Sequence, residues 1–163
     1  MQVRDIMTSP AVSVPPTLSV AEAARLMVAH RIGSVVVVAA EDPTRVVGLF
    51  TESDLELAEV LVPMTMPAAH ATRLMDLWAQ SPEQLHEALA SIARRTVGEA
   101  MRSPAPTVAA DAEVWWAMSR MAELEIARMP VVDGERLVGL LARHDLLKAL
   151  AALDGEGPAT REG

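Results

Sequence analysis

The sequence predicts an α+β fold made of two copies of a β-α-β-β-α unit, with a helical insert between them. Two observations carry this prediction. The phrase VVGLFTESDL returns 91 residues later as LVGLLARHDL. Around it, residues 3–38 match residues 97–132 at 12 of 36 positions, and residues 45–58 match residues 136–149 at 7 of 14. A duplication of this length indicates a repeated structural unit.

The elements of copy one follow from its hydrophobic periodicity and its capping residues. A short extended piece, AVSV, precedes a helix that Ser19 and Glu22 begin as a capping box. Apolar runs at 34–38 and 45–50 have the length of buried strands. A second helix is expected to start at the polar step before Asp54.

Copy two repeats this order. APTV is the extended piece, and Asp111 is the expected N-cap of a helix whose inner stripe consists of Val114, Ala117, Met118 and Met121. The strands MPVV and RLVGLL follow, and a second helix begins near Asp145. One unit of about 55 residues forms a sheet with one open face. Two units are therefore expected to cover each other as a pseudo-twofold pair.

The segment between the copies has helical patterns of its own. Residues 68–79, and a stretch with Ser81 as N-cap and Pro82 at the first helical position, predict two helices. This insert either packs over its own module or offers a methionine-rich surface to a partner. The expected divisions of the chain are 1–58 for repeat one, 59–96 for the insert, 97–152 for repeat two and 153–163 for a disordered tail.

Composition excludes several classes of function. The formal net charge of −8 argues against nucleic-acid binding, which needs a basic face. The absence of cysteine excludes disulfides, thiolate metal sites and cysteine nucleophiles. The longest unbroken apolar run, 35–40, is too short to span a bilayer, and no apolar signal core begins the chain. We therefore expect a cytoplasmic protein without membrane or nucleic-acid partners.

Nothing in the sequence predicts catalysis. It contains no glycine-rich phosphate loop and no Gly-x-Ser-x-Gly elbow. Glu52 and Asp54 lie two residues apart at a helix start, a spacing that does not aim two carboxylates at one point. His30, His70 and His86 share no spacing typical of a metal site. We expect no catalytic residue, no metal and no obligatory cofactor.

Taken together, the motifs DIMTSPAVSV, VGEAMRSPAPTV and ARMPVVD and the two Gly-Leu…Asp-Leu phrases resemble a tandem CBS-domain pair, or Bateman module. The resemblance covers residues 3–58 and 97–150. It implies a pseudo-twofold module with a cleft between the repeats for up to two adenosine-type ligands. Typical ligands are AMP, ADP, ATP and S-adenosylmethionine, with cyclic di-AMP in some members. It also implies a regulatory sensor that acts on a separate partner protein.

The resemblance assigns roles to the repeated phrase. In the family, the Asp of Gly-x-x-Thr/Ser-x-x-Asp holds the ribose hydroxyls and the Thr or Ser helps to bind phosphate. Copy one matches in full, with Thr51 and Asp54. Copy two keeps Asp145 but has Ala142 in place of the hydroxyl, so that Arg143 or His144 would have to substitute. A carboxylate suits a vicinal diol, and a helix start suits a phosphate.

The adenine ring needs apolar walls and a few backbone hydrogen bonds. The short strands are expected to supply both, through Ser13, Val14, Val36, Thr107, Val108, Met129 and Pro130. Because copy one has the fuller motif, its site is expected to bind more strongly.

Two alternatives stay open. Thr51-x-x-Asp54 also fits a capping box that needs no ligand. Ala142 favours a ligand-free structural or protein-interaction module whose nucleotide sites have decayed.

Two adjacent tryptophans predict a contact surface. Trp115 and Trp116 align with Ala21 and Glu22 of copy one, and a position that accepts Glu is not deep core. At least one of the two rings should therefore lie at the surface. It would pack against the insert or form a homodimer interface, and we favour the interface.

Overall fold

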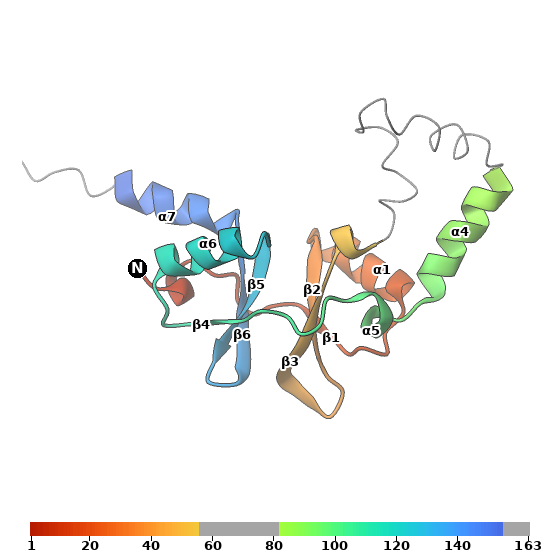
Figure 1. Cartoon of the computed structure of the whole chain (residues 1–163), viewed down its shortest axis with the longest axis horizontal. Helices are drawn as coiled ribbons and strands as arrows, with labels where there is room; N and C mark the ends of the chain where they lie inside the picture. The colour runs from red at the N-terminus through yellow and green to blue at the C-terminus, as the bar shows by residue number, and fades with distance from the viewer. Residues whose placement is uncertain (56–81, 155–163) are drawn as a thin grey trace, which may run out of the picture.

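The computed structural model describes residues 1–55 and 82–154 of the chain. Its strands form one six-stranded sheet in the order β1-β2-β3-β6-β5-β4. The hairpins β2–β3 and β5–β6 meet in the middle, with the helices on their outer sides (Figure 1). The only pairing between β3 and β6 joins Arg45 to Arg136. The α+β pair of repeats is thus confirmed.

The elements follow the predicted order. Up to residue 55 they are the 3-10 turn η1 (Val3–Asp5), β1 (Ser13–Val14), α1 (Val20–His30), β2 (Ser34–Ala39), β3 (Asp42–Thr51) and the 3-10 turn η2 (Glu52–Asp54). From residue 82 they are α4 (Pro82–Arg94), α5 (Val97–Ala100), β4 (Val108–Ala109), α6 (Val114–Glu123), β5 (Arg128–Asp133), β6 (Arg136–Ala142) and α7 (Asp145–Asp154). The positions where the second helix of copy one was expected to continue, the helix expected at 68–79 and the tail after 154 lie outside the described residues.

The capping box that begins α1 is confirmed. The Glu22 backbone N–H donates to the Ser19 hydroxyl at 3.2 Å, and the Glu22 carboxylate accepts from the Ser19 N–H at 3.0 Å. The hydrogen bonds from the Ser19 hydroxyl and then its backbone N–H lower the pKa of the Glu22 carboxyl. The helix buries the stripe Val20, Ala23 and Met27. Local sequence therefore fixes both the start of α1 and its inner face.

The prediction of Asp111 as N-cap of α6 is wrong. The helix begins at Val114, and the N-cap position is Glu113, whose side chain makes no capping hydrogen bond. The Val114 N–H instead donates to the Met1 carbonyl at 3.1 Å. The start of the chain thus caps a helix of copy two, a long-range contact that local sequence does not reveal.

The first eight residues belong structurally to copy two. The Val3 N–H donates to the Ala112 carbonyl at 2.9 Å, and Thr8 and Leu140 exchange two backbone hydrogen bonds of 3.0 and 2.9 Å. Val3 and Ile6 are buried in the hydrophobic cluster of copy two. Copy two is therefore completed by the leading segment of copy one.

The leading segment of copy two in turn packs on copy one. Arg102 and Leu49 exchange two backbone hydrogen bonds of 2.9 and 3.0 Å, and the Val97 N–H donates to the Leu18 carbonyl at 2.7 Å. Val97 is fully buried in the hydrophobic cluster of copy one. A third cluster lies between the copies and is built on Val36, Val38 and Leu49. Each of the three clusters therefore contains residues of both copies, and the copies pack as a single unit.

The glycine of the repeated phrase stands where these segments cross. A Cβ on Gly48 would lie 3.0 Å from the Arg102 carbonyl oxygen, and one on Gly139 would lie 2.9 Å from the Thr8 carbonyl oxygen. Each would also collide with a methionine sulfur, of Met101 or of Met7. Only glycine leaves room for the opposite backbone here.

We expect Gly48→Ala and Gly139→Ala each to lower the free energy of unfolding by about 1–3 kcal/mol, because the added methyl overpacks a backbone crossing. Urea unfolding followed by circular dichroism measures this change. Gly134→Asn is the matched control, because Gly134 has φ +62° and no atom within 4 Å of a built Cβ, and Asn tolerates that conformation. Two alanine variants as stable as the parent would contradict the crossing as a packing constraint.

Candidate functional site

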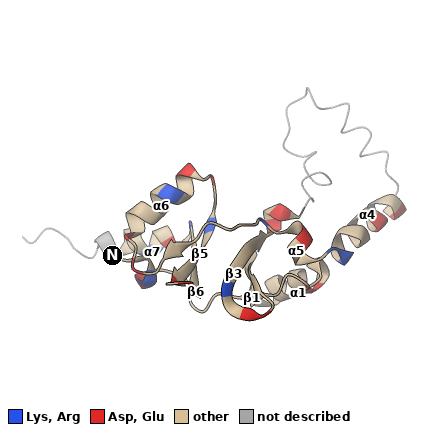
Figure 2. Cartoon of the chain, turned by 60° about the horizontal axis from the view of Figure 1, so that its bottom comes forward, with Lys and Arg blue, Asp and Glu red and all other residues tan. Residues whose placement is uncertain are grey.

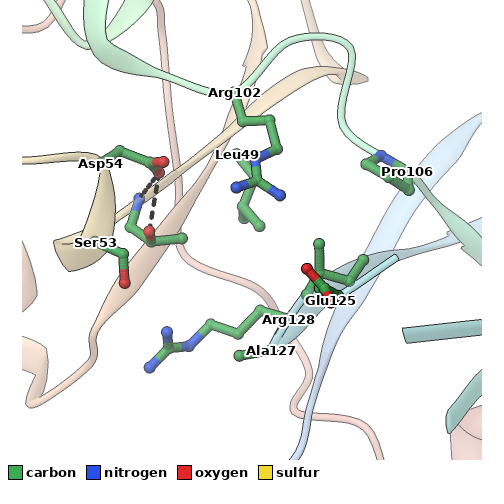
Figure 3. Close-up of a pocket in the computed structure, with 10 residues that line it drawn as sticks. Leu49, Ser53, Asp54, Arg102, Pro106, Glu125, Ala127 and Arg128 are labelled. Atoms are coloured by element: carbon green, nitrogen blue, oxygen red, sulfur yellow. Dashed lines mark hydrogen bonds between the residues drawn. The ribbon is translucent and has the colours of Figure 1, made fainter. Parts of the chain in front are cut away.

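A pocket opens between the two copies, beside the end of β3 (Figure 3). Copy one contributes the end of β3 and the turn η2, and copy two contributes its leading segment and the loop between α6 and β5. The lining residues are Leu49, Thr51, Ser53, Asp54, Arg102, Pro106, Glu125, Ile126, Ala127 and Arg128. The pocket therefore exists only where the copies are joined.

The Asp54 carboxylate is held in a fixed position on one wall. Its Oδ2 accepts from the Thr51 backbone N–H at 2.8 Å and from the Thr51 hydroxyl at 2.9 Å. No described residue donates to its Oδ1. One oxygen therefore orients the group, and the other remains free to accept from a ligand.

The strand before it anchors this turn. Thr51, the last residue of β3, pairs with Ser34, the first residue of β2. The Glu52 N–H then donates to the Gly33 carbonyl at 3.1 Å. The sheet thus sets where Thr51 and Asp54 lie, and η2 turns the carboxylate back toward the end of the strand.

Two arginines of copy two reach the same pocket. Arg102 is fixed through its backbone on Leu49, and its guanidinium lies near the Leu49 side chain in the close-up (Figure 3). Arg128 begins β5, and its Nη2 lies 3.7 Å from Glu52 Oε1 of copy one. This ion pair is longer than a hydrogen bond and partly exposed, so it holds Arg128 only weakly.

Apart from Ser53 and one further acid, the remaining lining is apolar. Leu49, Pro106 and Ile126 offer hydrocarbon surface, and Leu49 and Ile126 are each only 7% exposed. Glu125 stands at the exposed rim with φ +53°. The pocket thus combines a free carboxylate oxygen, two guanidiniums and apolar walls, a set that suits a ligand with a diol, an anionic group and a flat ring.

The structure brings two of the predicted ligand residues, Thr51 and Asp54, into this pocket. Five others are at most 3% exposed and lie in the protein interior, namely Val14, Val36, Val108, Met129 and Pro130. Another four are exposed and do not line this pocket, namely Ser13, Thr107, Arg143 and His144.

Asp145 occupies the position in copy two that corresponds to Asp54. Its Oδ2 accepts from the Ala142 N–H at 2.8 Å, and its Oδ1 accepts from Lys148 Nζ at 2.6 Å. The residue is 3% exposed. Both of its oxygens are therefore engaged by the chain itself, which gives Asp145 a structural role at the start of α7.

The two arginines were not predicted from the repeated phrase. Arg102 aligns with Thr8 of copy one and Arg128 with Ser34, so the copies differ in charge at both positions. A search of the aligned copies for such differences would have found them. Their convergence also depends on the exchange of leading segments, which the repeat pattern alone does not show.

Basic and acidic residues are interleaved over both copies in Figure 2 and do not gather on one face in that view. Among residues 1–55 and 82–154, no group of three or more His, Asp or Glu is placed to hold a metal ion. None of the helices in these ranges is both long and apolar enough to cross a membrane.

The family model of the CBS domain matches residues 3–61 and 97–152. A similar solved structure is the CBS domain of a CBS-domain-containing membrane protein from Sphaerobacter thermophilus. It is 32% identical with a TM-score of 0.66, and the match covers 91% of this chain and 86% of that one.

Two further similar structures contain ligands. CBSX2 in complex with AMP is 22% identical with a TM-score of 0.65, and the match covers 94% of this chain and 98% of that one. The CBS domain pair of protein MJ0100 in complex with 5′-methylthioadenosine and S-adenosyl-L-methionine is 22% identical with a TM-score of 0.66, again over 94% and 98% of the two chains. The comparison with curated proteins found no match.

The two aspartates are expected to differ in their effect on stability. Asp145→Ala should lower the free energy of unfolding by about 1–3 kcal/mol, because it leaves the Ala142 N–H without its acceptor and removes the carboxylate partner of Lys148. Asp54→Ala should cost less, about 1 kcal/mol, because it removes only the contacts with Thr51. Urea unfolding of both variants tests this order, with the exposed carboxylate variant Glu123→Ala as control. A larger loss in Asp54→Ala would contradict it.

Proposed function

This chain belongs to the CBS-domain family, and we propose that it binds a phosphate-bearing adenosine nucleotide such as AMP, ADP or ATP in the pocket between its copies. The observation that carries the proposal is the placement of Asp54 and two arginines around one apolar pocket. Similar structures hold AMP, S-adenosyl-L-methionine and 5′-methylthioadenosine, which share an adenosine group. That shared group supports an adenosine ligand here.

Different residues around the pocket contact the three parts of the ligand, which are the ribose, the phosphate and the base. The free Oδ1 of Asp54 accepts from a ribose hydroxyl. Arg102 and Arg128 bind the phosphate through charge-assisted hydrogen bonds. Leu49 and Ile126 contact the base.

Charge favours phosphate over sulfonium. The ribose occupies the free oxygen of Asp54, so the charged groups left for the rest of the ligand include the two guanidiniums, which are charged hydrogen-bond donors. A phosphate gains charge-assisted hydrogen bonds from these donors, whereas a sulfonium gains none. We therefore rank AMP above S-adenosylmethionine as the ligand.

The role that fits this pocket is regulation. The ligand would contact Asp54 of copy one and Arg128 of copy two at once, so it binds best to one relative placement of the copies. A ligand shifts such an equilibrium only through its different affinity for the two states. A separate partner protein reads the shift.

We also propose a homodimer that buries the helices of copy two. Trp115 and Trp116 are 47% and 59% exposed, which confirms the prediction of a surface position. On α7 of the same copy, Leu147 and Leu150 are 57% and 48% exposed. Large apolar side chains exposed together are typical of an interface.

Arg102→Gln and Arg128→Gln should each weaken AMP binding by about 10-fold or more, because each removes a charged hydrogen bond to phosphate. Neither should change adenosine binding. Asp54→Ala should weaken both ligands, and more than Asp145→Ala does. Isothermal titration of each variant with AMP and adenosine measures these effects.

Arg120→Gln is the matched control for these titrations, because Arg120 pairs with Glu123 on α6 and lies outside the pocket. Arginine variants that weaken adenosine as much as AMP would contradict the assignment of the phosphate. No binding of any adenosine ligand by the folded protein, shown free of carried-over nucleotide, would favour the ligand-free interaction module instead.

The variant Trp115→Ser/Trp116→Ser should shift the protein toward monomer, because it removes most of the apolar area proposed to be buried between subunits. Sedimentation velocity over a dilution series measures the shift. The matched control is Val28→Ser, because Val28 is 78% exposed on α1 of the other copy. A parent protein that is monomeric at every concentration would overturn the dimer.

A further inference from the structure

The copy-two aspartate already has a cationic partner. Asp54 and Asp145 each accept, at 2.8 Å, from the backbone N–H three residues earlier. Beyond this shared contact they differ. Lys148 Nζ donates to Asp145 Oδ1 at 2.6 Å, whereas no described residue donates to the corresponding oxygen of Asp54. The atom that is free to accept a ligand hydroxyl in copy one is engaged in copy two.

The lysine is held at two points. Its Nζ also donates to the Ile6 carbonyl at 2.9 Å, in the leading segment that crosses from copy one. The Lys148 side chain is 49% exposed, so solvent moderates the ion pair, but the Asp145 side chain that it contacts is only 4% exposed. A ligand hydroxyl would therefore have to compete with an ammonium ion for a carboxylate that is almost fully buried.

The alignment of the copies explains why only one aspartate is paired. Lys148 aligns with Leu57 of copy one, which carries no charge. Lys148 is also the only lysine among the 163 residues. The sole lysine of the chain thus stands at the one position where it neutralises the second aspartate of the repeat.

The other charges around the two aspartates differ as well. Arg102 and Arg128 align with Thr8 and Ser34, so the copy-two counterpart of the pocket has neither of the phosphate-binding arginines. It gains one arginine, Arg31, in place of Glu125. Arg31 and Glu125 both have a left-handed backbone, at φ 54° and 53°. The two positions therefore keep the same backbone and differ in their charge.

We propose that the Lys148 ammonium takes the place of a ribose hydroxyl at Asp145 and thereby makes the chain bind one nucleotide instead of two. This inference rests on the proposed function, because it concerns the second site of the same binding module. The repeat provides two equivalent places, and the Lys148–Asp145 pair closes one of them. Lys148 acts as a positioning residue that sets stoichiometry and leaves the affinity of the Asp54 pocket unchanged.

Isothermal titration with AMP tests the proposal. The parent protein should bind one AMP per chain, and Lys148→Met should bind a second AMP at least about 10-fold more weakly than the first, because the uncovered site lacks both arginines. Lys148→Arg is the matched control and should keep one AMP per chain, because it restores the cation beside Asp145.

The outcomes separate the two proposals. Two AMP molecules per chain in the parent would overturn the role of Lys148 and leave the proposed function standing. No AMP in the parent would overturn the proposed function itself. A folded Lys148→Met protein that still binds one AMP would show that the lysine does not close the site.

A second measurement needs no variant at all. Because the chain has one lysine, protein labelled with ¹³C at lysine Cε gives a single NMR signal, from Lys148. This signal should stay in place while AMP saturates the Asp54 pocket. A shift that follows AMP saturation would mean that nucleotide displaces the ammonium, and the proposal would then be wrong.

Discussion

The backbone at Thr8 and at Arg102 each passes directly against a glycine of the opposite copy, Gly139 and Gly48. The rest of the structure depends on these two backbone crossings. At each of them a pair of backbone hydrogen bonds ties a leading segment to the strand that carries the repeated phrase. The same segments place Val3 and Val97 in the core of the other copy. Neither copy therefore has a complete core by itself, which gives a physical reason for the duplication.

The crossings also build the pocket. Arg102 enters it because its backbone is fixed on Leu49, immediately beside the Gly48 crossing. Arg128 enters it because β5 begins opposite η2, where it meets Glu52. Under the proposed function, a ligand held between Asp54 and Arg128 touches both copies close to contacts that already join them, the Leu49–Arg102 hydrogen bonds and the Glu52–Arg128 ion pair. Its binding then depends on the relative placement of the copies.

Pseudo-symmetry of the backbone coexists with asymmetry of the chemistry. Asp54 and Asp145 have the same local backbone contact, and Arg31 and Glu125 share the same unusual φ. The charged neighbours are not shared, because Lys148, Arg102 and Arg128 have no charged counterparts in the other copy. One fold thus provides two positions that differ in the charged side chains around them.

Local signals in the sequence predicted most of the fold. The Ser19–Glu22 capping box, Pro82 at the start of α4 and the apolar runs of β2 and β3 needed only neighbouring residues, and the structure agrees with them. The N-cap of α6 was missed because Met1 supplies the acceptor from more than a hundred residues away.

The site was predicted only in part, for the same reason. The motif identified Thr51 and Asp54, which lie within one turn of each other. Arg102 and Arg128 meet copy one through contacts between the copies, which no single phrase encodes. The Lys148–Asp145 pair is local, three residues apart on α7, and is visible in the sequence only when the two copies are aligned. Of the residues proposed to contact adenine, Ser13 and Thr107 are exposed, and the other five are at most 3% exposed, namely Val14, Val36, Val108, Met129 and Pro130.

The central claim is that one nucleotide binds at Asp54 and touches both copies. An NMR titration of ¹⁵N-labelled protein with AMP tests it most directly. The account predicts saturable shifts at Thr51 to Asp54, at Arg102 and at Glu125 to Arg128, with the corresponding amides at Ala142 to Asp145, Thr8 and Arg31 to Ser34 unmoved. Saturable shifts confined to the second group, or to copy one alone, would contradict it.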